Sequence, residues 1–533
     1  MRSISRRTTF ALVMLALAGS QPVAAQGTLR VAMTLADIPL TDGAPDQGTE
    51  GVRFSGYTIF DPLVNWDLSQ ADHPADITPG LATEWAPRVD DPTRWIFKLR
   101  QGVRFHDGSP FNADAVIFSL ERAMNSAHPA YDASAHRQLA TFIPAVKACR
   151  KIDDFTVEIE TKGAASQLPY QLTRFLVVSP AQYEAVGRDW AAFRRSPSGT
   201  GPWRMETLVP RQRMELVRNA DYWNKDRIPK LDRLVLLPVP EVSARTAALL
   251  SQRVDWAESP SPDTVSRLRQ AGFTISTNAI PHMWPYTLSV LPDSPLHDIR
   301  VRKALNLAID REGLVRVLNG LAVPSVGSVP PDHPWFGNPS FHIRYDPAEA
   351  KRLLAEAGYG PDHRLRLKFA ISTSGSGQMY PLVMNEFVQE NFRQVGVDLE
   401  LEVLEWEALR GRRRDGAQAA SNRGIHAINN SYGTSDPYNA LQRYVHPSEI
   451  PPAGSNWGNI NDPLLTSLTE QVDAEFDRSR QDALLAKLHE RMVDQAYFVW
   501  VVHDVGSRAL SSHVQGHVHA KSWFVDFSSI SLR

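Results

Sequence analysis

Alternating hydrophobic and polar positions predict a strand–helix–strand unit in the second half of the chain. Hydrophobic residues alternate with polar ones over residues 365–371 and again over residues 397–403, which is the period of a half-buried strand. Between these segments, hydrophobic side chains recur on one helical face over residues 382–392. A helix between two strands at this spacing is typical of a βαβ unit, whose strands are parallel and whose crossover is right-handed.

Three further helices are predicted from capping residues and hydrophobic spacing. Asp346, which precedes a proline, is a suitable N-cap, and Gly358 is a suitable end for the same helix. Asn112 is a suitable N-cap for a helix that continues to about residue 124. Residues 480–496 carry leucines and a methionine on one side.

The first part of the chain predicts strands. Residues 29–33 are expected to form a first strand, and residues 94–106 a hairpin that turns at Gln101–Gly102. Strands and helices are mingled along the whole chain, and no repeat interrupts them. This order predicts an α/β protein with at least two lobes.

The N-terminal residues have the features of a signal peptide. Arginines at positions 2, 6 and 7 precede a short apolar stretch over residues 10–18, and small residues then predict cleavage after Ala25. Ser5–Arg7 is similar to a twin-arginine signal, so the twin-arginine and general export routes both stay open. No cysteine lies where a lipid anchor would attach, so we expect an exported protein without an anchor.

Net charge and cysteine content limit the possible binding partners and the possible cellular compartment of the protein. The 533 residues carry a net charge of −2, which gives no electrostatic footprint for nucleic acid. The only cysteine is Cys149, so no intramolecular disulfide can form, and its hydrophobic neighbours indicate burial rather than reactivity. An exported protein without an anchor is most useful in a periplasm, where an outer membrane retains it.

Candidate chemistry is sparse. His106–Asp107 lies in Phe105-His106-Asp107-Gly108 before Ser-Pro, which favours a tight turn over a catalytic pair. The histidines at 513, 517 and 519 could hold a metal, although solvated side chains are the simpler interpretation. Residues 412–414 (Arg-Arg-Arg) are interpreted as a charged, solvated loop rather than an anion site, and residues 372–377 as a flexible loop. No catalytic site, metal site or cofactor is expected.

Several longer segments together resemble a known family. Gly80–Trp85, Trp95–Gly108 and Phe111–Leu120 form one signature region. The blocks Gly199–Trp203, Arg218–Trp223, Asp298–Arg311 and Tyr345–Tyr359 follow in order. The sequence resembles the extracytoplasmic solute-binding proteins of the peptide/nickel type, solute-binding protein family 5, over essentially the whole chain after residue 25.

The resemblance implies an α/β, two-lobe periplasmic-binding-protein fold with a hinge and with a subdomain inserted in lobe one. By analogy, lobe one takes residues 26–280 and the C-terminal return, 500–533, and lobe two takes residues 281–499. The implied function is to capture a small polar or peptide-like solute for an inner-membrane ABC permease, as a monomer and not as an enzyme. The alternative is an exported hydrolase that uses His106 or the C-terminal histidines.

The resemblance also indicates where a peptide's amino group would bind. Peptide-binding members place an acidic residue in a lobe-two loop that is matched here by residues 429–437. If Asp436–Pro437 is the anchor of the match, the acid's usual position is Gly433, which cannot neutralise an ammonium. Asp436 could serve instead, or could belong to a structural turn.

Candidate ligand contacts follow from position within the two-lobe scheme. Core packing is the alternative for each tryptophan, and plain surface exposure is the alternative for the first two residues. The candidates are Glu50, Arg53 and Tyr57 after the first strand; His282 and Trp284 at the crossing into lobe two; Trp406 after the second strand of the βαβ unit; Tyr432, Ser435 and Asp436 on the lobe-two loop; and Trp457 on the following loop.

Overall fold

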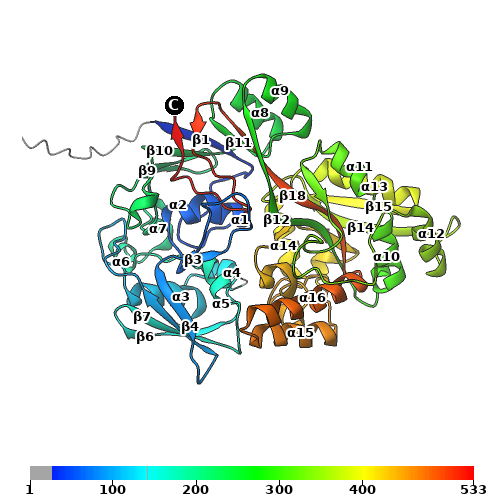
Figure 1. Ribbon diagram of the computed structural model, residues 1–533, viewed down its shortest axis with the longest axis horizontal. Coiled ribbons are helices and arrows are strands. Elements are labelled where there is room, and N and C mark those ends of the chain that lie inside the picture. The colour runs from blue at the N-terminus through cyan, green and yellow to red at the C-terminus, as the bar shows by residue number, and fades with distance from the viewer. Residues whose placement is uncertain (1–26, 141) are drawn as a thin grey trace, which may run out of the picture.

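Two lobes lie side by side and are joined by two long strands (Figure 1). The computed structural model describes residues 27–140 and 142–533. The connecting strands are β12 (Thr274–Leu288) and β18 (Phe498–Leu510), which pair antiparallel and belong to one sheet that runs through both lobes. We use lobe one for residues 27–280 and 500–533, and lobe two for residues 281–499. The expected signal peptide, residues 1–25, lies outside the described residues.

The shared sheet has the order β15-β14-β16-β12-β18-β11-β1-β10-β9-β8. Its first strand, expected at 29–33, is confirmed as β1 (Thr28–Met33), which is parallel to both of its neighbours. The other lobe-one strands of this sheet are β8 (Trp203–Val209), β9 (Arg213–Arg218), β10 (Arg233–Pro238) and β11 (Trp256–Glu258). Leucine and valine side chains of β1 and β10 are buried in the lobe-one core with Trp203 and Trp256.

A four-stranded antiparallel sheet, order β4-β5-β7-β6, forms a separate subdomain of lobe one. Its elements are β4 (Ala82–Pro87), β5 (Arg94–Leu99), β6 (Val146–Asp153), β7 (Thr156–Thr161), α3 (Ala113–Met124) and α4 (Ala133–Leu139). The helix expected after Asn112 is confirmed as α3, and the Asn112 side chain accepts the Ala115 N–H. The hairpin over residues 94–106 is wrong, because β5 pairs with β4 and with the distant β7 instead.

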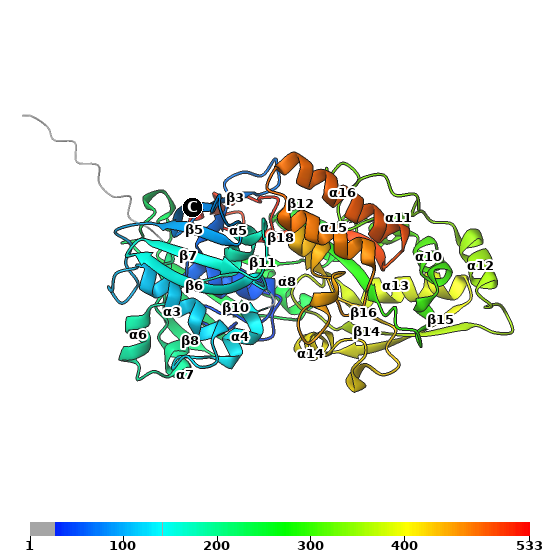
Figure 2. The same ribbon diagram turned by 90° about the horizontal axis from the view of Figure 1, so that it is seen from below.

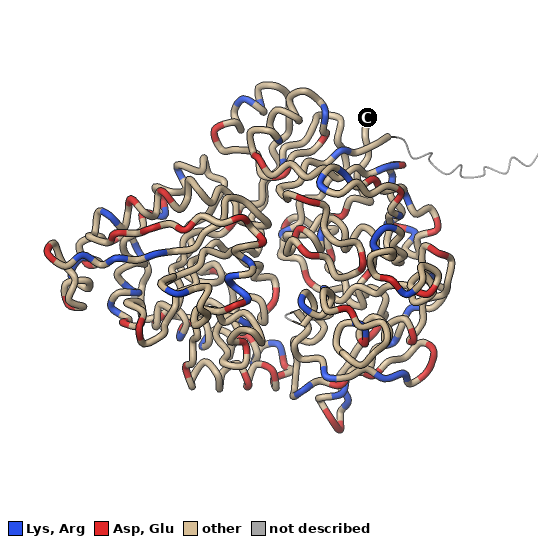
Figure 3. Tube along the Cα trace, turned by 180° about the vertical axis from the view of Figure 1, so that it is seen from behind, with Lys and Arg blue, Asp and Glu red and all other residues tan. Residues whose placement is uncertain are grey.

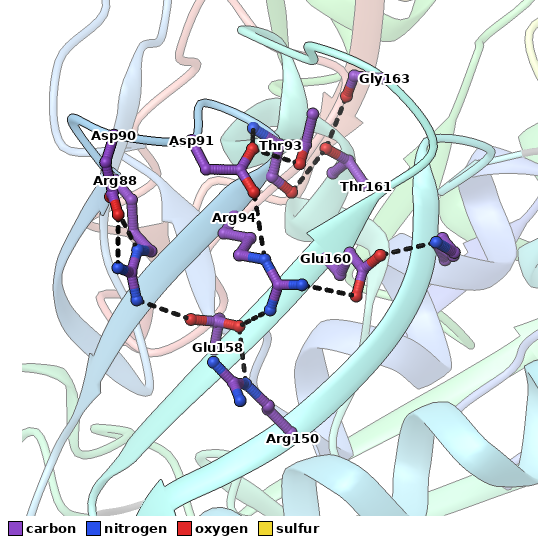
Figure 4. A network of polar contacts seen from close by, with 11 residues as sticks. Arg88, Asp90, Asp91, Thr93, Arg94, Arg150, Glu158, Glu160, Thr161 and Gly163 are labelled. Carbon is purple, nitrogen blue, oxygen red and sulfur yellow. Dashed lines mark hydrogen bonds and ion pairs between the residues drawn. The ribbon is translucent and has the colours of Figure 1, made fainter.

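Charged side chains form a network across this small sheet (Figure 4). Glu158 on β7 is buried beneath Arg94 and Arg150, whose nitrogens lie 2.8 and 2.7 Å from its carboxylate, and Arg88 lies at 3.6 Å. Hydrogen bonds from Arg150, followed by those from Arg94, hold the pKa of Glu158 below its usual value. The network therefore ties three strands of the subdomain together through one carboxylate.

The predicted βαβ unit of lobe two is confirmed. β14 (Leu365–Ser372) and β15 (Val397–Leu404) are parallel and in register from Leu365 opposite Val397, and α13 (Pro381–Gln394) connects them. The two other predicted helices are α12 (Pro347–Glu356), whose N-cap Asp346 accepts the Glu349 N–H, and α16 (Arg478–Asp494). Lobe two also contains β13 (Ala322–Pro324), β16 (Ala427–Asn429), β17 (Tyr432–Gly433), α10 (Ile299–Leu307), α11 (Arg311–Val317), α14 (Trp406–Asp415) and α15 (Pro463–Ala474).

The remaining lobe-one elements are short. Residues 49–59 form one continuous helical segment, made of α1 (Thr49–Gly51), a π-turn (Val52–Gly56) and α2 (Tyr57–Ile59). The others are β2 (Val64–Trp66), β3 (Ile77–Pro79), α5 (Leu168–Gln171), α6 (Pro180–Ala185), α7 (Trp190–Arg195), α8 (Val242–Leu250), α9 (Val265–Gln270), β19 (Val514–Gln515) and β20 (Ser531–Leu532). None of the helices in the described ranges is long and apolar enough to cross a membrane.

His106 and Asp107 lie in the predicted turn and bond to different partners. The His106 Nε2 donates to the Gly201 carbonyl at 2.9 Å, while the Asp107 carboxylate accepts from the Ser109 N–H and the Ser179 hydroxyl. Gly108 has a φ of 89°, and its N–H closes the turn on Phe105. Burial lowers the pKa of His106 to about 4. The turn interpretation is confirmed, and the two side chains do not form a dyad.

The C-terminal histidines bond to different partners, although the ring centroids of His517 and His519 lie 5.3 Å apart. His513 bonds to Asp255 at 3.0 Å, His519 bonds to Ser276 at 2.8 Å, and the His517 ring packs against Trp256. Among the described residues, no group of three or more potential metal ligands is found. Burial raises the pKa of the half-buried Cys149 thiol to about 12, so this thiol is protonated at neutral pH.

Candidate ligand-binding cleft

Three cavities line the boundary between the lobes. The smallest, about 60 Å³, is walled by residues of both lobes and is called the arginine pocket here. A cavity of about 380 Å³, the hinge cavity, lies beside it and includes Thr34, Glu50 and Trp523 of lobe one with Tyr380 of lobe two. A larger outer cavity, about 1050 Å³, includes His136 and Gln171 of lobe one and Tyr438 of lobe two. The boundary therefore offers both a tight pocket and room for a larger solute.

Four arginines set the chemistry of the arginine pocket. Arg174 comes from lobe one, Arg410 and Arg413 from α14, and Arg443 from the segment after β17. None of the residues described as lining this pocket is an aspartate or a glutamate. Elsewhere, positive and negative residues intermingle over both lobes, as the chain trace in Figure 3 shows. The pocket is therefore a local concentration of positive charge in a nearly neutral protein.

Among the residues that the structure describes, only one of these arginines has a carboxylate partner. Arg410 pairs with Glu407 at 2.8 Å, and it reaches across the boundary to Gln138 of lobe one at 3.4 Å. Arg443 donates to Asn439 at 2.6 Å and to Ser455 at 2.8 Å, and it lies over the Phe142 ring of lobe one.

Arg174 and Arg413 have no ion-pair partner within the described chain. Arg174 has a long hydrogen bond to Thr49, at 3.5 Å, and its guanidinium lies 4.6 Å from the centre of the Phe142 ring. Burial lowers the pKa of Arg413 to about 10, with Arg443 and Arg410 nearby as like charges, and burial also lowers the pKa of Arg174. With a pKa of about 10, Arg413 remains charged at neutral pH.

Aromatic side chains complete the wall. Trp406, His282 and Tyr432 line the pocket, and the Tyr432 ring stacks on Tyr444 with centroids 4.0 Å apart. His282 stacks on Trp523 at 4.5 Å, and its Nδ1 lies 3.4 Å from Asp504. Three of the ten residues predicted as ligand contacts are thus brought together in one pocket.

Two glycines in residues 372–377 allow this wall to form. A Cβ on Gly375 would lie 2.4 Å from the Trp406 ring, and one on Gly377 would lie 2.4 Å from the His282 ring. Both have positive φ, 133° and 68°. Ser376 between them accepts the Glu50 N–H of lobe one at 3.1 Å. This segment, interpreted from its composition as a flexible loop, lies packed between the lobes.

The lobe-two loop has no acid that points into the pocket. Gly433 pairs with His282 and carries no side chain, and a Cβ there would meet only the Pro281 carbonyl, at 3.8 Å. Asp436 is buried outside the pocket lining, and its carboxylate accepts the N–H and the side-chain amide of Asn439, at 2.9 and 2.8 Å. Asp436 is therefore engaged in the structural turn, the second of its two interpretations.

The other predicted contacts lie elsewhere. Glu50 lines the hinge cavity, and Arg53 is buried between Glu50 and Glu258, at 2.9 and 3.0 Å. The Tyr57 hydroxyl donates to the Thr173 carbonyl inside lobe one. The remaining three line none of the three boundary cavities: Trp284 and Trp457 are completely buried in the lobe-two cores, and Ser435 is half-buried. Plain surface exposure, the alternative given for Glu50 and Arg53, does not hold, because both are almost completely buried.

The four arginines were not among the predicted contacts. The interpretation of residues 412–414 as a solvated loop is wrong, because they lie in helix α14. A usable signal existed, since Trp406, Arg410 and Arg413 are spaced by four and three residues and so share a helical face. Arg174 and Arg443 lie far from this helix in the sequence and carry no local signal.

The lobes also contact each other directly at the edge away from β12 and β18. There the Ser166 hydroxyl donates to the Val472 carbonyl at 2.9 Å and accepts the Gln481 amide at 2.8 Å, and the Ser166 N–H donates to the Asp473 carbonyl. Tyr170 bonds to Arg478 at 3.1 Å in the same region. We call these contacts the mouth latch; Figure 2 shows α15 and α16 beside the four-stranded sheet of lobe one.

Comparison with known proteins identifies the family. The profile described as bacterial extracellular solute-binding proteins, family 5, matches residues 76–451, well over half of the chain, and the chain belongs to this family. The heme-binding protein A of Haemophilus influenzae is 28% identical over 91% of this chain and 89% of its own. The dipeptide-binding protein of Escherichia coli is 26% identical over 92% of this chain and 95% of its own.

Solved structures agree on the fold. The periplasmic binding protein DppA of Helicobacter pylori, in complex with the peptide STSA, superposes with a TM-score of 0.81 at 23% identity, over 95% of this chain and 98% of its own. AgaA from A. tumefaciens R10, in complex with agropinic acid, gives 0.77 at 19% identity, over 95% and 99%. The two-lobe periplasmic-binding-protein fold is confirmed.

Family membership defines the role of the chain. It is a substrate-binding component of an ABC importer, and the hydrolase alternative gains no support from any of these relatives. The family is made up of binding proteins that work outside the cytoplasm.

Proposed function

We propose that this protein captures a small polar solute, peptide-like in size, between its lobes and delivers it from the periplasm to an inner-membrane ABC permease. The observation that carries the proposal is that Arg174 and Phe142 of lobe one wall the same pocket as Arg413, Trp406 and other residues of lobe two. A solute in this pocket contacts both lobes at once, so its binding energy favours the closed state.

Three of the predicted contacts are kept in this proposal. His282, Trp406 and Tyr432 supply rings along the pocket, against which the apolar part of a solute can pack. Glu50 is kept as a residue of the adjoining hinge cavity. Trp284 and Trp457 are not proposed as contacts, because a fully buried ring cannot reach a solute without repacking its core.

Unblocked peptides are not the preferred cargo in this proposal. An ammonium buried beside Arg413 and Arg443 would lack an acid at position 433, and Asp436 is already engaged with Asn439. We therefore expect weak binding of di- to pentapeptides with a free amino terminus. Isothermal calorimetry that gave submicromolar affinity for such peptides would overturn this part of the proposal.

The protein is proposed to act as a monomer that binds and releases its solute unchanged. Export by a signal peptide cleaved after Ala25 and the absence of a lipid anchor belong to this proposal and rest on the sequence. Mass spectrometry of the intact mature protein from a periplasmic extract measures both, since cleavage without lipidation fixes the mass.

The decisive experiment identifies the cargo. Protein purified from the periplasm is analysed by native mass spectrometry, the released compound is identified, and it is added back to emptied protein while small-angle scattering follows closure. We expect retention of one compound, compaction on its return, and recovery of the same compound. Conversion of the compound, lost in the His106→Ala variant, would favour the hydrolase; a protein that retains no compound and never compacts would refute the proposal.

A further inference from the structure

We propose that the cargo is an acidic solute that presents at least two anionic groups, carboxylate or phosphate, to the arginine pocket. This inference rests on the proposed function, because it names the chemical class of the solute held between the lobes. It follows from the charges that the protein leaves unpaired in the pocket and from the donors that it leaves unmatched there.

Three of the pocket's four guanidinium groups lack a counter-ion. Arg174, Arg413 and Arg443 have no carboxylate within ion-pairing distance among the described residues, and only Arg410 is paired, with Glu407. Arg443 is almost completely buried. Burying like charges together without partners is costly, and a folded protein normally pairs or neutralises them. One anionic group can neutralise one of these charges, so the pocket accommodates two or more.

The nearest carboxylates do not fill this role. Asp436 is held by Asn439 and acts on Arg174 and Arg443 only beyond ion-pairing distance, and Glu50 is paired with Arg53. Glu449 accepts from the Tyr438 hydroxyl at 3.2 Å and acts on Arg443 only beyond ion-pairing distance. Within the described structure, no carboxylate therefore neutralises Arg174, Arg413 or Arg443 at ion-pairing distance, and a bound solute could do so.

Unmatched donors support the same conclusion. The Arg443 Nε and the Trp406 Nε1 are buried without a hydrogen-bond acceptor within the described structure, and both residues line the pocket. A buried donor without an acceptor is rare and costly, so a ligand that brings acceptors stabilises it. Ionised carboxylate and phosphate groups are acceptors, and their geometry matches the fork of a guanidinium.

The test compares matched acids and neutral analogues. Thermal unfolding of the emptied protein is measured with glutarate and tricarballylate against glutaramide, and with propane-1,3-diol bisphosphate against propane-1,3-diol. We expect the acids, and not their neutral analogues, to raise the unfolding temperature, and a higher salt concentration to reduce the effect. The comparison between the carboxylates and the phosphate tells which anionic group the pocket prefers.

Two variants of helix α14 make the test specific to the pocket. Arg413→Gln removes a charge that has no hydrogen-bond or ion-pair partner in the described structure, whereas Arg412→Gln removes a neighbouring charge that is paired with Glu402 at 2.7 Å outside the pocket. We expect Arg413→Gln to weaken binding of the native cargo and of the best acid by about 10- to 100-fold. Arg412→Gln is expected to leave both affinities within about twofold.

The emptied variants provide a readout that does not depend on any ligand. Without cargo, Arg413→Gln is expected to unfold at a temperature equal to or above that of the wild type, because it removes an unpaired positive charge from beside two others. A neutral or cationic native cargo, equal stabilisation by acids and amides, or equal losses in the two variants would overturn the inference. A neutral cargo bound in the cleft would leave the proposed transport function intact, whereas the absence of any cargo and of closure would refute that function itself.

Discussion

The mouth latch predicts that direct contacts between the lobes contribute measurably to closure. In Ser166→Ala, the hydroxyl loses one bond to the Val472 carbonyl and one from the Gln481 amide, while the backbone bond from position 166 to Asp473 remains. A neutral hydrogen bond contributes about 0.5–1.5 kcal/mol. The closed state should therefore lose about 1–3 kcal/mol relative to the open state.

The partners of Ser166 limit the loss to this range. The Gln481 amide keeps its bonds to the Val472 and Glu475 carbonyls within lobe two, at 3.3 and 2.9 Å, so this donor stays paired. A third bond to the Ser166 hydroxyl, from the Gln167 amide at 3.4 Å, lies within lobe one, and its loss affects the open and closed states alike. The folded lobes themselves should be unaffected, and the unfolding temperature should change little. The ligand should dissociate about 5- to 100-fold faster, because one tenfold change corresponds to about 1.4 kcal/mol.

The assay measures closure and dissociation in the same protein. Small-angle scattering or energy transfer between a label on each lobe gives the closed fraction, and stopped-flow displacement gives the dissociation rate. Ser467→Ala on α15 is the control, because this serine is exposed and its hydroxyl bonds only to Gln471 of the same helix. Equal closed fractions and equal dissociation rates in wild type and Ser166→Ala would refute the reasoning.

Three further predictions concern pH and the pocket wall. Glu158→Gln should lower the free energy of unfolding by about 1–3 kcal/mol at pH 7. Because the pKa of Glu158 is lowered in the folded state, the difference in stability between wild type and variant should persist above about pH 4.5 and vanish as the pH falls through the folded-state pKa. Urea titrations at several pH values measure this difference. Burial raises the pKa of Asp473 to about 7, so the stability of the wild type should fall as the pH rises from about 4 to 7, and Asp473→Asn should flatten this slope; an unchanged slope would contradict the assignment. Gly375→Ala should displace Trp406 and weaken cargo binding about tenfold or more. The control is Gly396→Ala, which also has a positive φ but no atom near its Cβ; it should cost only about 1 kcal/mol of stability and leave binding unchanged. Equal cargo binding by the two variants would contradict the role given to Gly375.

Local patterns predicted the elements whose signals are local. The βαβ unit of lobe two and the helices that begin after Asn112 and Asp346 are set by periodicity and caps within a few residues, and all three are present. The hairpin over residues 94–106 failed for a physical reason. β5 is a central strand that pairs with β4 on one side and, on the other, with β7, which lies more than 50 residues later and which a local pattern cannot reveal.

The pocket was only partly predictable. Position in the two-lobe scheme predicted His282, Trp406 and Tyr432 as ligand contacts, and these three line the pocket. The same reasoning predicted Trp284, which is buried in the core of lobe two. An aromatic residue near a strand end can turn either way, and its local sequence does not decide which. The arginine pocket forms where the two lobes meet, and the residues adjacent to each arginine in the sequence do not indicate this contact.

The strand β12 has an irregularity that links the pocket to the hinge. Its pairing with β18 skips from Ala279 to Met283, and in the interval the Pro281 carbonyl accepts the Thr434 N–H while His282 pairs with Gly433. A pair of strands bends most easily where its backbone hydrogen bonds are interrupted. Here β12 forms backbone hydrogen bonds with the loop that borders the pocket instead of with β18. The loop is thus attached to β12 at an irregularity of this strand, which runs through both lobes. A cargo that displaces this loop would therefore act on β12 at the point where its pairing with β18 is interrupted.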